Sequence, residues 1–481
     1  MASMKNYSSI GSGRWLTMRS GMRDFGFQMP QPKVVPWVPK TSTREPGMAS
    51  RETSPIMRGQ MEGWKLRYLR VTVGTRGAWR ETWWLNSEEW KGEGARMKLH
   101  RLLAEGCVTV LGTVFKEGTV LDRVLESTFE ANPKWGKRDR AFVAETVFEV
   151  VRWRRALAFI ADNPQPAALC AAQWQRMGIE IPDWWSWEGC KVEDMTARET
   201  ALADQPRAVR ESIPDWLDVR GENELGAQWD LELSALNRRA PIFLRVNRLL
   251  GSVEETGKWL ESEGILTRRV EHAPDALEVT LGRIGKPLIA TGRFEIQDAG
   301  SQRIAPLLGV EPGMRVLDLC AGAGGKTLQL AALMENRGEI IALDVAGRKL
   351  VELERRAQRA RVSIIRKELW GPNTLRSLTA WADRVLIDAP CSGLGTLRRQ
   401  PDLKWRLTAA ALEKARRTQK AMLEQYPELM RAGGAFVYAT CSILIEDLVG
   451  REPHWQIGES LTVSPAATTS DGFYAARLAK K

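Results

Sequence analysis

The sequence predicts a multidomain protein whose C-terminal part is an α/β domain built on an open, mostly parallel sheet. From residue 301 onward, short apolar runs alternate with amphipathic helical stretches, which is the pattern of a parallel sheet covered by helices on both faces. Before residue 301 the pattern changes from a helical period to a mixture of strands and helices. The length of 481 residues suits roughly two to four domains.

Residues 1–96 look unlike the rest of the chain. They hold seven tryptophans and 16 lysines and arginines against 8 acidic residues, without a sustained helical or strand period. Three interpretations stay open for them: a disordered basic arm, an artefactual extension, and an arginine-rich transit peptide. We favour an extension with the natural start at Met97, because regular patterning begins abruptly there.

Residues 97–210 are expected to form an all-α domain. Leu121, Val124 and Leu125 recur at the spacing of one helix face, and a helical pattern continues through residues 138–155. Because this region has no cluster of titratable side chains, we expect an accessory domain.

Residues 211–300 are expected to form a small α+β module. The run "PIFLRVN" (241–247) is typical of a strand, and "DALEVTL" and "RFEIQD" supply further strands. Ser252 and Glu255 form a capping-box signature, which predicts that a helix begins after Ser252.

Residues 301–481 alternate apolar strands with helical stretches. The predicted strands are "MRVLDL" (314–319), "GEIIALD" (338–344), "RVLIDAP" (384–390) and "GAFVYATCS" (434–442). Between the second and third runs, Leu350, Leu353, Ala357 and Ala360 share one face of an amphipathic helix. Ligands of such sheets bind beyond the carboxyl ends of the strands, so the residues that follow each run are candidates for a site.

A glycine-rich turn follows the first of these strands, in "LDLCAGAGGKTLQL" (317–330). A phosphate-binding P-loop is excluded because Cys320 stands where its first glycine is required, and a dinucleotide-binding pattern fails at Thr327. The strand, turn and helix N-terminus that remain suit an anionic or polar ligand group. Asp344, at the end of the next strand, is placed to accept hydrogen bonds from ribose hydroxyls. An adenosine-containing cofactor fits, S-adenosylmethionine better than ATP; the alternative is a purely structural turn.

Two cysteines lie at the carboxyl ends of two later strands, in "DAPCSG" (388–393) and "YATCSI" (438–443). A thiolate near loop amides and basic groups is a potential nucleophile. A single cysteine in such a place is more often a buried filler. Because Cys391 and Cys441 fall in one predicted cleft, each beside a serine and a turn, the pair favours chemistry.

These motifs resemble those of the RsmB/Nop2/Sun family of RNA cytosine-C5 methyltransferases. The stretches that carry the resemblance are "LDLCAGAGGKT", "IALD", "DAPCSGLGTLRRQPDLKW" and "YATCS". "FEIQDAGSQ" (294–302) resembles the segment that leads into the family's catalytic domain, which has a Rossmann-like fold. Residues 97–210 are similar to the NusB-like, RNA-binding domain of the family's bacterial 16S rRNA enzymes, and residues 211–300 to their small linking module.

The resemblance implies covalent catalysis of methyl transfer from S-adenosylmethionine to C5 of a cytosine in RNA. It implies that Cys441 attacks C6 of the base, that Cys391 assists resolution of the adduct, and that Asp388 hydrogen-bonds or protonates the ring and orients the cofactor. The residues implied to hold S-adenosylmethionine are Cys320, Ala321, Gly322, Ala323, Gly324, Gly325, Lys326, Asp344 and Asp388.

The expected partner is RNA, with ribosomal RNA ahead of tRNA. The target base must leave its stack, so a single-stranded or distorted site is expected. Arg398, Arg399, Lys404 and Trp405 offer positive charge and an aromatic face and are predicted to contact RNA; the alternative is a solvated loop or a packed tryptophan. Residues 301–481 hold 27 lysines and arginines against 19 acidic residues, which fits RNA and a merely soluble basic surface equally.

Several classes are not expected. The chain has no run of 18 uncharged apolar residues, three histidines and six scattered cysteines without a C-x-x-C pair. These counts argue against a membrane span, a metal site and a disulfide scaffold, and they favour the reducing cytoplasm. A monomer is expected.

Three departures from the family pattern motivate a second hypothesis. The cofactor turn reads C-A-G-A-G-G-K instead of the usual C-A-A-P-G-G-K, Glu368 is the nearest candidate for a further acid that contacts adenosine, and the segment after Cys441 is short enough to affect sheet closure. The hypothesis from another class is an RNA-binding or ribosome-assembly factor that has lost methyl transfer.

Overall fold

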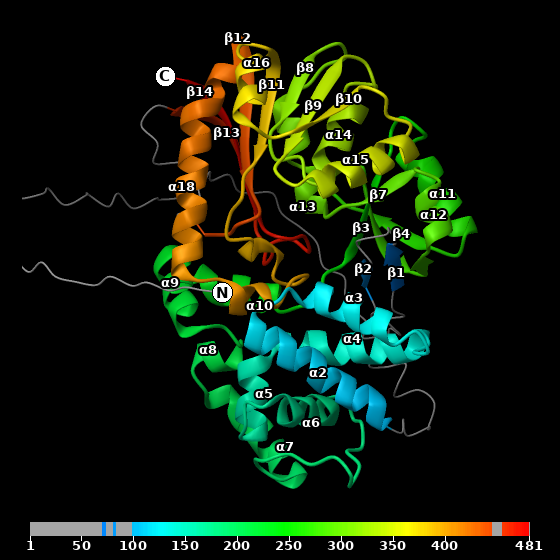
Figure 1. The fold of residues 1–481 in the computed structure, drawn as a ribbon, viewed down its shortest axis with the longest axis vertical. Helices are drawn as coiled ribbons and strands as arrows, with labels where there is room; N and C mark the ends of the chain where they lie inside the picture. Colours follow the sequence, from blue (N-terminus) through cyan, green and yellow to red (C-terminus); the bar gives the residue numbers. More distant parts are fainter. Residues whose placement is uncertain (1–69, 74–79, 83–98, 445–454, 481) are drawn as a thin grey trace, which may run out of the picture. The chain divides into compact units, whose positions relative to one another are not determined.

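The computed structural model describes residues 70–73, 80–82, 99–444 and 455–480. Helices form the first long stretch of the described chain (Figure 1). They are α2 (Arg101–Glu117), α3 (Leu121–Ala131), α4 (Lys137–Arg152), α5 (Arg154–Ala161), α6 (Pro166–Arg176), α7 (Val192–Ala201), η1 (Leu202–Asp204), α8 (Arg207–Arg210), α9 (Asp215–Leu225) and α10 (Gln228–Leu236).

The helices α2 to α6 pack around a shared apolar core. Leu121, Val124 and Leu125 are buried, as the helical spacing predicted. Trp174 is fully buried in this core, and its indole nitrogen donates a hydrogen bond to the Thr146 hydroxyl at 3.1 Å. The hydrogen bond satisfies the one polar atom of a large apolar side chain.

Helical structure continues beyond residue 210. Helices α9 and α10 lie in the part of the chain that the sequence suggested would be mixed, and their buried Leu217 and Leu233 join a core that includes Leu394 and Leu412 of the later domain. The predicted domain boundaries at residues 210 and 300 stay predictions.

A four-stranded antiparallel sheet follows, in the order β4-β5-β3-β7. Its elements are β3 (Ile242–Val246), α11 (Val253–Ser262), β4 (Leu266–Arg269), β5 (Ala276–Leu281), β6 (Arg283–Ile284), α12 (Lys286–Ala290) and β7 (Phe294–Ile296), of which β6 lies outside the four strands. The capping box is confirmed at the start of α11, because the Ser252 hydroxyl accepts from the Glu255 amide and the Glu255 carboxylate from the Ser252 amide.

The C-terminal part is a seven-stranded mixed sheet in the order β10-β9-β8-β11-β12-β14-β13. Neighbouring strands from β10 to β12 are parallel, whereas β14 runs antiparallel to both of its neighbours, β12 and β13. Its strands are β8 (Arg315–Asp318), β9 (Glu339–Asp344), β10 (Ile365–Leu369), β11 (Ala382–Asp388), β12 (Met430–Thr440), β13 (Trp455–Val463) and β14 (Phe473–Lys480). Its helices are α13 (Ala299–Gln302), η2 (Ala305–Leu308), α14 (Gly325–Leu333), α15 (Gly347–Arg359), α16 (Pro372–Ser377), η3 (Leu394–Thr396), α17 (Leu403–Arg406), α18 (Ala409–Gln425) and η4 (Tyr426–Leu429).

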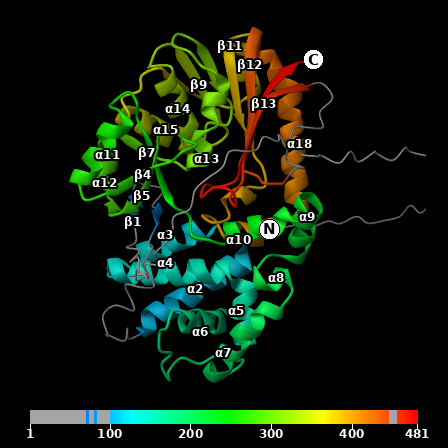
Figure 2. The same cartoon turned by 180° about the vertical axis from the view of Figure 1, so that it is seen from behind.

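Helices cover both faces of this sheet, as predicted (Figures 1 and 2). Successive residues of β9 point to opposite faces. Ile340 and Ala342 pack with α14 and α15, whereas Ile341 and Leu343 belong to the core that includes residues of α16 and α18. Four parallel strands were predicted and are present, and together with β10 they make a Rossmann-like sheet.

Two features of the sheet differ from the expectations. β10 was not predicted, because its sequence "IRKEL" is charged and mostly exposed, as an edge strand allows. The short segment after Cys441 does not prevent sheet closure, since β14 pairs with β12. The pairing runs from Phe436 opposite Leu478 to Thr440 opposite Tyr474.

Most of residues 1–96 lie outside the described residues. Two short strands are described there, β1 (Arg70–Val73) and β2 (Arg80–Thr82), and β1 pairs with β6. The interpretation of residues 1–96 as an extension stays a prediction.

Candidate active site

A cavity of about 990 Å³ borders the carboxyl ends of β8, β9, β11 and β12. This is where an open parallel sheet binds its ligands. Nearly all of the residues predicted for the site line it: Cys320, Ala321, Gly322, Ala323, Gly325, Lys326, Asp344, Asp388, Cys391 and Cys441. Gly324 is not part of the lining and lies at the start of α14.

The glycine-rich turn is shaped by two left-handed residues. Gly322 has φ 58° and Gly324 has φ 87°, a region that favours glycine. A Cβ at Gly324 would also lie 2.7 Å from Cγ of Leu353, so this position packs directly against α15. The Asp344 carboxylate stabilises the same turn, because it accepts a hydrogen bond from the Gly322 amide at 2.9 Å. It also accepts from the Ala346 amide at 2.8 Å, just after β9.

The cavity fits a cofactor that carries ribose, adenine and an ammonium group. Asp318 is buried, its Oδ2 accepts from the Thr327 hydroxyl at 2.7 Å, and its Oδ1 has no hydrogen-bond partner among the described residues. An acceptor in this state suits a cationic or N–H donor of a ligand. Trp370 and Tyr426 line the cavity near Asp344 and join through a 3.1 Å hydrogen bond, which adds aromatic surface for a base.

Burial also sets the titration of Asp318. Removal from water raises the pKa of its carboxyl group to about 6, and the nearby Asp388 carboxylate acts in the same direction. The Thr327 hydrogen bond and Lys326 oppose this shift. A group with this pKa exchanges its proton near neutral pH.

Lys326 and Asp388 form an ion pair inside the cavity. Nζ of Lys326 lies 2.6 Å from Oδ2 of Asp388, and the lysine side chain is 10% exposed. Burial disfavours the charged lysine, but the Asp388 carboxylate outweighs burial and holds the pKa of Lys326 above its ordinary value. The cavity therefore holds a charged lysine bound to a carboxylate at the end of β11.

The two predicted cysteines face each other. Sγ of Cys391 lies 3.4 Å from Sγ of Cys441, and both thiols border the cavity. Their positions follow from the parallel pairing of β11 with β12, in which Asp388 is opposite Ala439. The Ala389 amide continues the ladder to the Ala439 carbonyl at 2.8 Å. Two thiols and a carboxylate thus converge from motifs 50 residues apart.

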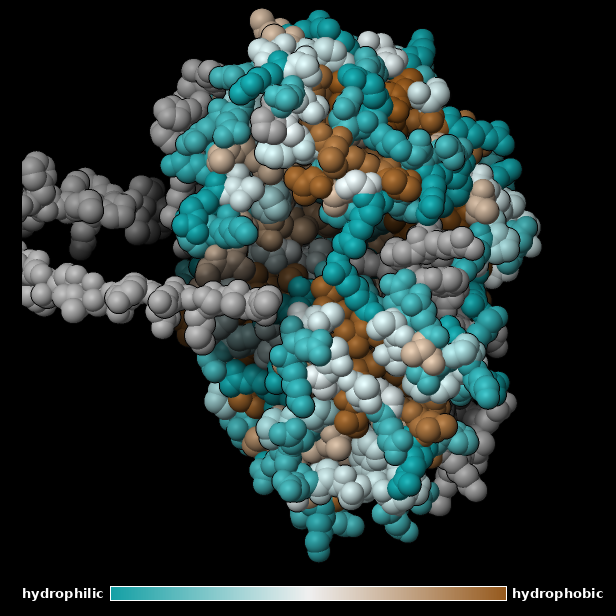
Figure 3. Space-filling view, in the orientation of Figure 1, coloured by the Kyte–Doolittle hydropathy of each residue, from teal (hydrophilic) through white to brown (hydrophobic). Residues whose placement is uncertain are grey.

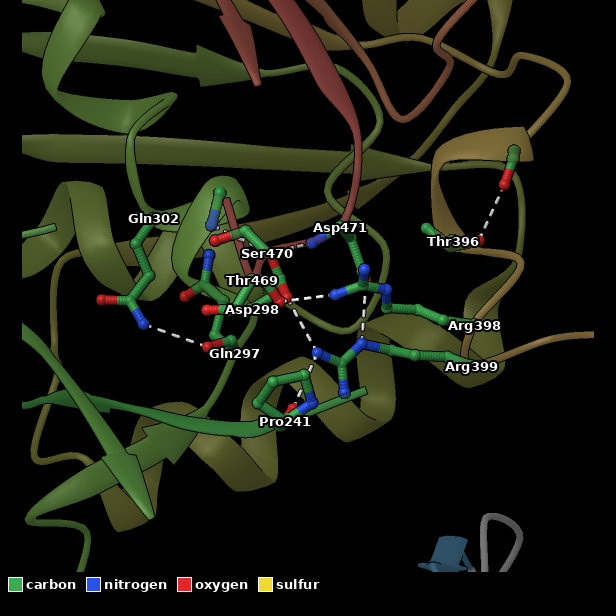
Figure 4. Close-up of polar contacts among 12 residues, drawn as sticks. Pro241, Gln297, Asp298, Gln302, Thr396, Arg398, Arg399, Thr469, Ser470 and Asp471 are labelled. Carbon is green, nitrogen blue, oxygen red and sulfur yellow. Dashed lines mark hydrogen bonds and ion pairs between the residues drawn. The ribbon is translucent and has the colours of Figure 1, made fainter. Parts of the chain in front are cut away.

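The structure argues against the predicted contact of Arg398 and Arg399 with RNA, because both guanidinium groups bind other segments of the protein (Figure 4). Arg398 is 3% exposed and donates to the carbonyls of Thr469 and Ala235. Arg399 pairs with Asp298 at 2.8 Å and with Asp471 at 2.7 Å. Burial works against the charge of Arg399, yet the two carboxylates raise its pKa above the ordinary value.

Lys404 and Trp405 are also structural, so their predicted contact with RNA is corrected here. Lys404 is 1% exposed, its Nζ donates to Oδ1 of Asn237 at 3.2 Å, and burial lowers its pKa well below the ordinary value. The Trp405 indole nitrogen donates to the Val151 carbonyl at 2.7 Å and the ring packs against the helical core. The alternative of a packed tryptophan is the one that holds.

Some lining residues were missed from the sequence. Glu368, the proposed adenosine-contacting acid, is not part of the lining and bonds to Arg366 at 2.7 Å, whereas Trp370, two residues later, lines the cavity. Lys414 and Arg417 line it from α18. The amphipathic pattern of α18 was the only available signal for them, and it does not show which face meets a ligand.

Two classes of site are absent from the described part of the chain. Residues 70–73, 80–82, 99–444 and 455–480 contain no group of three or more His, Cys, Asp and Glu side chains able to hold a metal. No helix within these ranges is long and apolar enough to span a membrane.

Comparison with known proteins agrees with this geometry. The family model described as 16S rRNA methyltransferase RsmB/F matches residues 305–452, and one described as the ferredoxin-like domain of RsmF/B-like methyltransferases matches residues 213–282. The crystal structure of a methyltransferase homolog protein from Pyrococcus horikoshii has a TM-score of 0.52 and 25% identity, over 58% of this chain and 99% of that one.

Curated proteins of similar sequence belong to the same family. The probable ribosomal RNA small subunit methyltransferase B of Synechocystis sp. is 32% identical over 300 residues, which cover 56% of this chain and 67% of the relative. The ribosomal RNA small subunit methyltransferase B of Cronobacter sakazakii is 32% identical over 286 residues, with 56% and 66% covered. The chain belongs to the 16S rRNA methyltransferase RsmB/F family of S-adenosylmethionine-dependent RNA methyltransferases.

Proposed function

We propose that this protein methylates C5 of a cytosine in ribosomal RNA of the small subunit through a covalent cysteine adduct. The observation that carries the proposal is the pair of thiols at 3.4 Å in one cavity with the Lys326–Asp388 ion pair and the glycine-rich turn. Cytosine C5 is a poor nucleophile, so a catalyst must first raise its electron density. A thiolate that adds to C6 does this.

We assign the roles from the family resemblance, and the placement of the side chains supports them. Sγ of Cys441 adds to C6 of the base. Asp388, held by Lys326, hydrogen-bonds the pyrimidine ring or, in its protonated form, protonates it. Bound S-adenosylmethionine supplies the electrophilic methyl group. After transfer, a base removes the C5 proton and the C6–Sγ bond breaks, which returns the Cys441 thiolate; Cys391 assists this release.

The cofactor contacts are proposed in the same way. The turn from Cys320 to Lys326 surrounds the methionine part, Oδ1 of Asp318 accepts from its ammonium group, and Asp344 binds the ribose hydroxyls. The buried unpartnered oxygen of Asp318 supports this assignment. Ribose recognition by a carboxylate at the end of a second strand is a recurring solution in such sheets.

The remaining modules are proposed to bind the same RNA. Helices α2 to α8 correspond to a NusB-like RNA-binding domain, and the four-stranded sheet corresponds to the linking module, which the ferredoxin-like family match supports. We place the enzyme in the cytoplasm as a monomer. None of the six cysteines, all within the described residues, forms a disulfide, which agrees with a reducing compartment.

Methyl transfer to unmethylated RNA tests the proposal. Purified protein is incubated with methyl-labelled S-adenosylmethionine and either 16S rRNA or tRNA from cells that lack this activity, and bisulfite sequencing locates 5-methylcytosine. Label in a single rRNA cytosine is expected. Label in tRNA alone would make tRNA the substrate, and RNA binding without label would favour an assembly factor that has lost catalysis.

A further inference from the structure

Two cations of α18 face the cavity, and no carboxylate of the described residues forms an ion pair with them. Lys414 and Arg417 are exposed and line the cavity. The acidic residues of this helix, Glu413 and Glu424, are not part of the lining, and Glu413 pairs with Arg416. Figure 3 shows hydrophilic side chains over the outer side of α18, at the upper left. The charged side chains that α18 contributes to the cavity lining are therefore both cationic, beside the uncharged Thr418, Ala421, Met422 and Gln425.

The acids that line the cavity bind other groups, apart from Oδ1 of Asp318, which the proposed function assigns to the ammonium group of the cofactor. Asp388 binds Lys326, Asp344 accepts from two backbone amides, and Asp318 accepts from Thr327. The charges of the α18 pair are thus left for a ligand. An ammonium and a guanidinium beside a deep cavity complement a polyanion better than a neutral molecule.

The position of the pair along α18 separates it from the proposed adenosine end. Two residues after Arg417, Nε2 of Gln419 donates to the Pro390 carbonyl at 2.8 Å, next to Cys391. The other end of α18 leads to Tyr426, which bonds to Trp370. Lys414 and Arg417 therefore lie toward the cysteine end of the cavity, where a target base enters.

We propose that Lys414 and Arg417 bind the phosphodiester groups that flank the target nucleotide and hold an RNA strand across the cavity mouth. This proposal rests on the proposed function. It gives the role once predicted for Arg398, Arg399 and Lys404 to side chains that are exposed. Arg398 and Lys404 are buried and Arg399 is held by two carboxylates, so these residues support the fold, and the α18 pair contacts the substrate.

The test is a charge reversal with a matched control on the same helix. Lys414→Glu/Arg417→Glu is compared with Lys420→Glu, because Lys420 is exposed on α18 but does not line the cavity. The double variant should bind rRNA at least about tenfold more weakly, with a salt-dependence slope smaller by roughly 1.4 for two lost contacts to single-stranded RNA. Lys420→Glu should stay within about twofold of the parent in both.

The outcomes separate this proposal from the proposed function. Parent-like RNA affinity and salt slope in the double variant would overturn the proposal, and so would a weakened affinity for S-adenosylmethionine with RNA binding unchanged. RNA affinity is measured without turnover. A parent protein that transfers no methyl group would therefore contradict the proposed function, while the affinity comparison would still decide whether Lys414 and Arg417 bind RNA.

A different observation assigns a positioning role to two serines. Oγ of Ser392 lies 2.7 Å from Oγ of Ser442, and the side chains are 2% and 1% exposed. Each serine follows one of the cavity cysteines and accepts a hydrogen bond from the backbone amide two residues later. Ser392 accepts from Leu394 at 3.3 Å, and Ser442 accepts from Leu444 at 3.1 Å. The hydroxyl pair thus joins the two loops that carry the thiols.

We infer that the Ser392–Ser442 hydrogen bond fixes the distance between the Cys391 and Cys441 thiols. A second contact agrees, since the Gly395 amide donates to the Cys441 carbonyl at 3.0 Å. Loss of either hydroxyl breaks the Ser392–Ser442 hydrogen bond and so removes one link between the two loops. Both serines act through the cysteines and touch no substrate.

Alanine variants of the two serines test this role. Ser392→Ala and Ser442→Ala should each lower kcat by about tenfold with KM for RNA unchanged, and the double variant should be no slower than either single one. Dibromobimane, which fluoresces when it bridges two close thiols, should link Cys391 and Cys441 less efficiently in the variants. Ser392→Thr, which keeps a hydroxyl, should recover both readouts. Additive losses, or unchanged bridging in folded variants, would overturn the inference.

Discussion

The sulfur atoms of Cys391 and Cys441 lie 3.4 Å apart at the carboxyl ends of β11 and β12. Neighbouring parallel strands bring their carboxyl ends to the same edge of a sheet, so the two loops meet although a long helical segment separates them. One base in the cavity can reach both thiols. This proximity allows one thiol to bond to the base while the other serves the release step.

The two cysteines are expected to respond differently to substitution. Cys441→Ala should abolish methyl transfer and the covalent protein–RNA adduct, because the attacking sulfur is gone. Cys391→Ala should form the adduct but resolve it slowly, so a complex stable to denaturing electrophoresis accumulates. If Cys391→Ala removed the adduct while Cys441→Ala kept it, the roles would be exchanged.

The Lys326–Asp388 ion pair is expected to be required for the chemical step. Lys326→Met leaves the Asp388 carboxylate without its cation, and Asp388→Asn removes the group that meets the ring. Each should lower the single-turnover rate by roughly 100-fold. Lys349→Met is the matched control, since Lys349 also lines the cavity but lies 3.8 Å from Asp344 with a half-exposed side chain. An equal loss in the control would show that any cation near the cavity suffices.

Arg399 is expected to contribute to stability. Arg399→Leu leaves Asp298 and Asp471 facing the interior without their partner, at a cost on the order of 3 kcal/mol in the free energy of unfolding. Arg399→Lys should recover only part of this, because an ammonium cannot reproduce the two-pronged contact. Urea denaturation measures both. Arg337→Leu, which breaks a mostly exposed pair with Glu335, should cost at most about 0.5 kcal/mol; similar losses in the two leucine variants would contradict an interior role.

Buried Lys404 is expected to make stability depend on pH. Burial lowers its folded-state pKa well below the ordinary 10.5. Between these two pKa values the unfolded chain binds more protons than the native protein, so the free energy of unfolding rises with pH and levels off above about 10.5. Lys404→Met should remove this contribution, and urea denaturation from pH 7 to 10 should show a shallower rise. Exposed Lys420→Met should keep the parent slope; an unchanged slope in Lys404→Met would refute the prediction.

The local patterns of the sequence were sufficient for the elements that carry the site. The apolar runs became β8, β9, β11 and β12 because their side chains are buried on both faces of the sheet. The capping box at Ser252 correctly predicted where α11 begins. The charged edge strand β10 escaped the same reasoning because an edge position tolerates exposed side chains.

The sequence by itself determined the four central strands, the glycine-rich turn and the cysteine motifs of the site, since periodicity and motif spacing are local properties of the chain. Only the tertiary structure decided which cations face the ligand. Arg398 and Lys404 looked accessible in a basic stretch, but their partners Ala235 and Asn237 come from α10 and its end, more than 160 residues earlier. Burial of a charge depends on whether such distant partners replace water, and that is settled when the domains pack together.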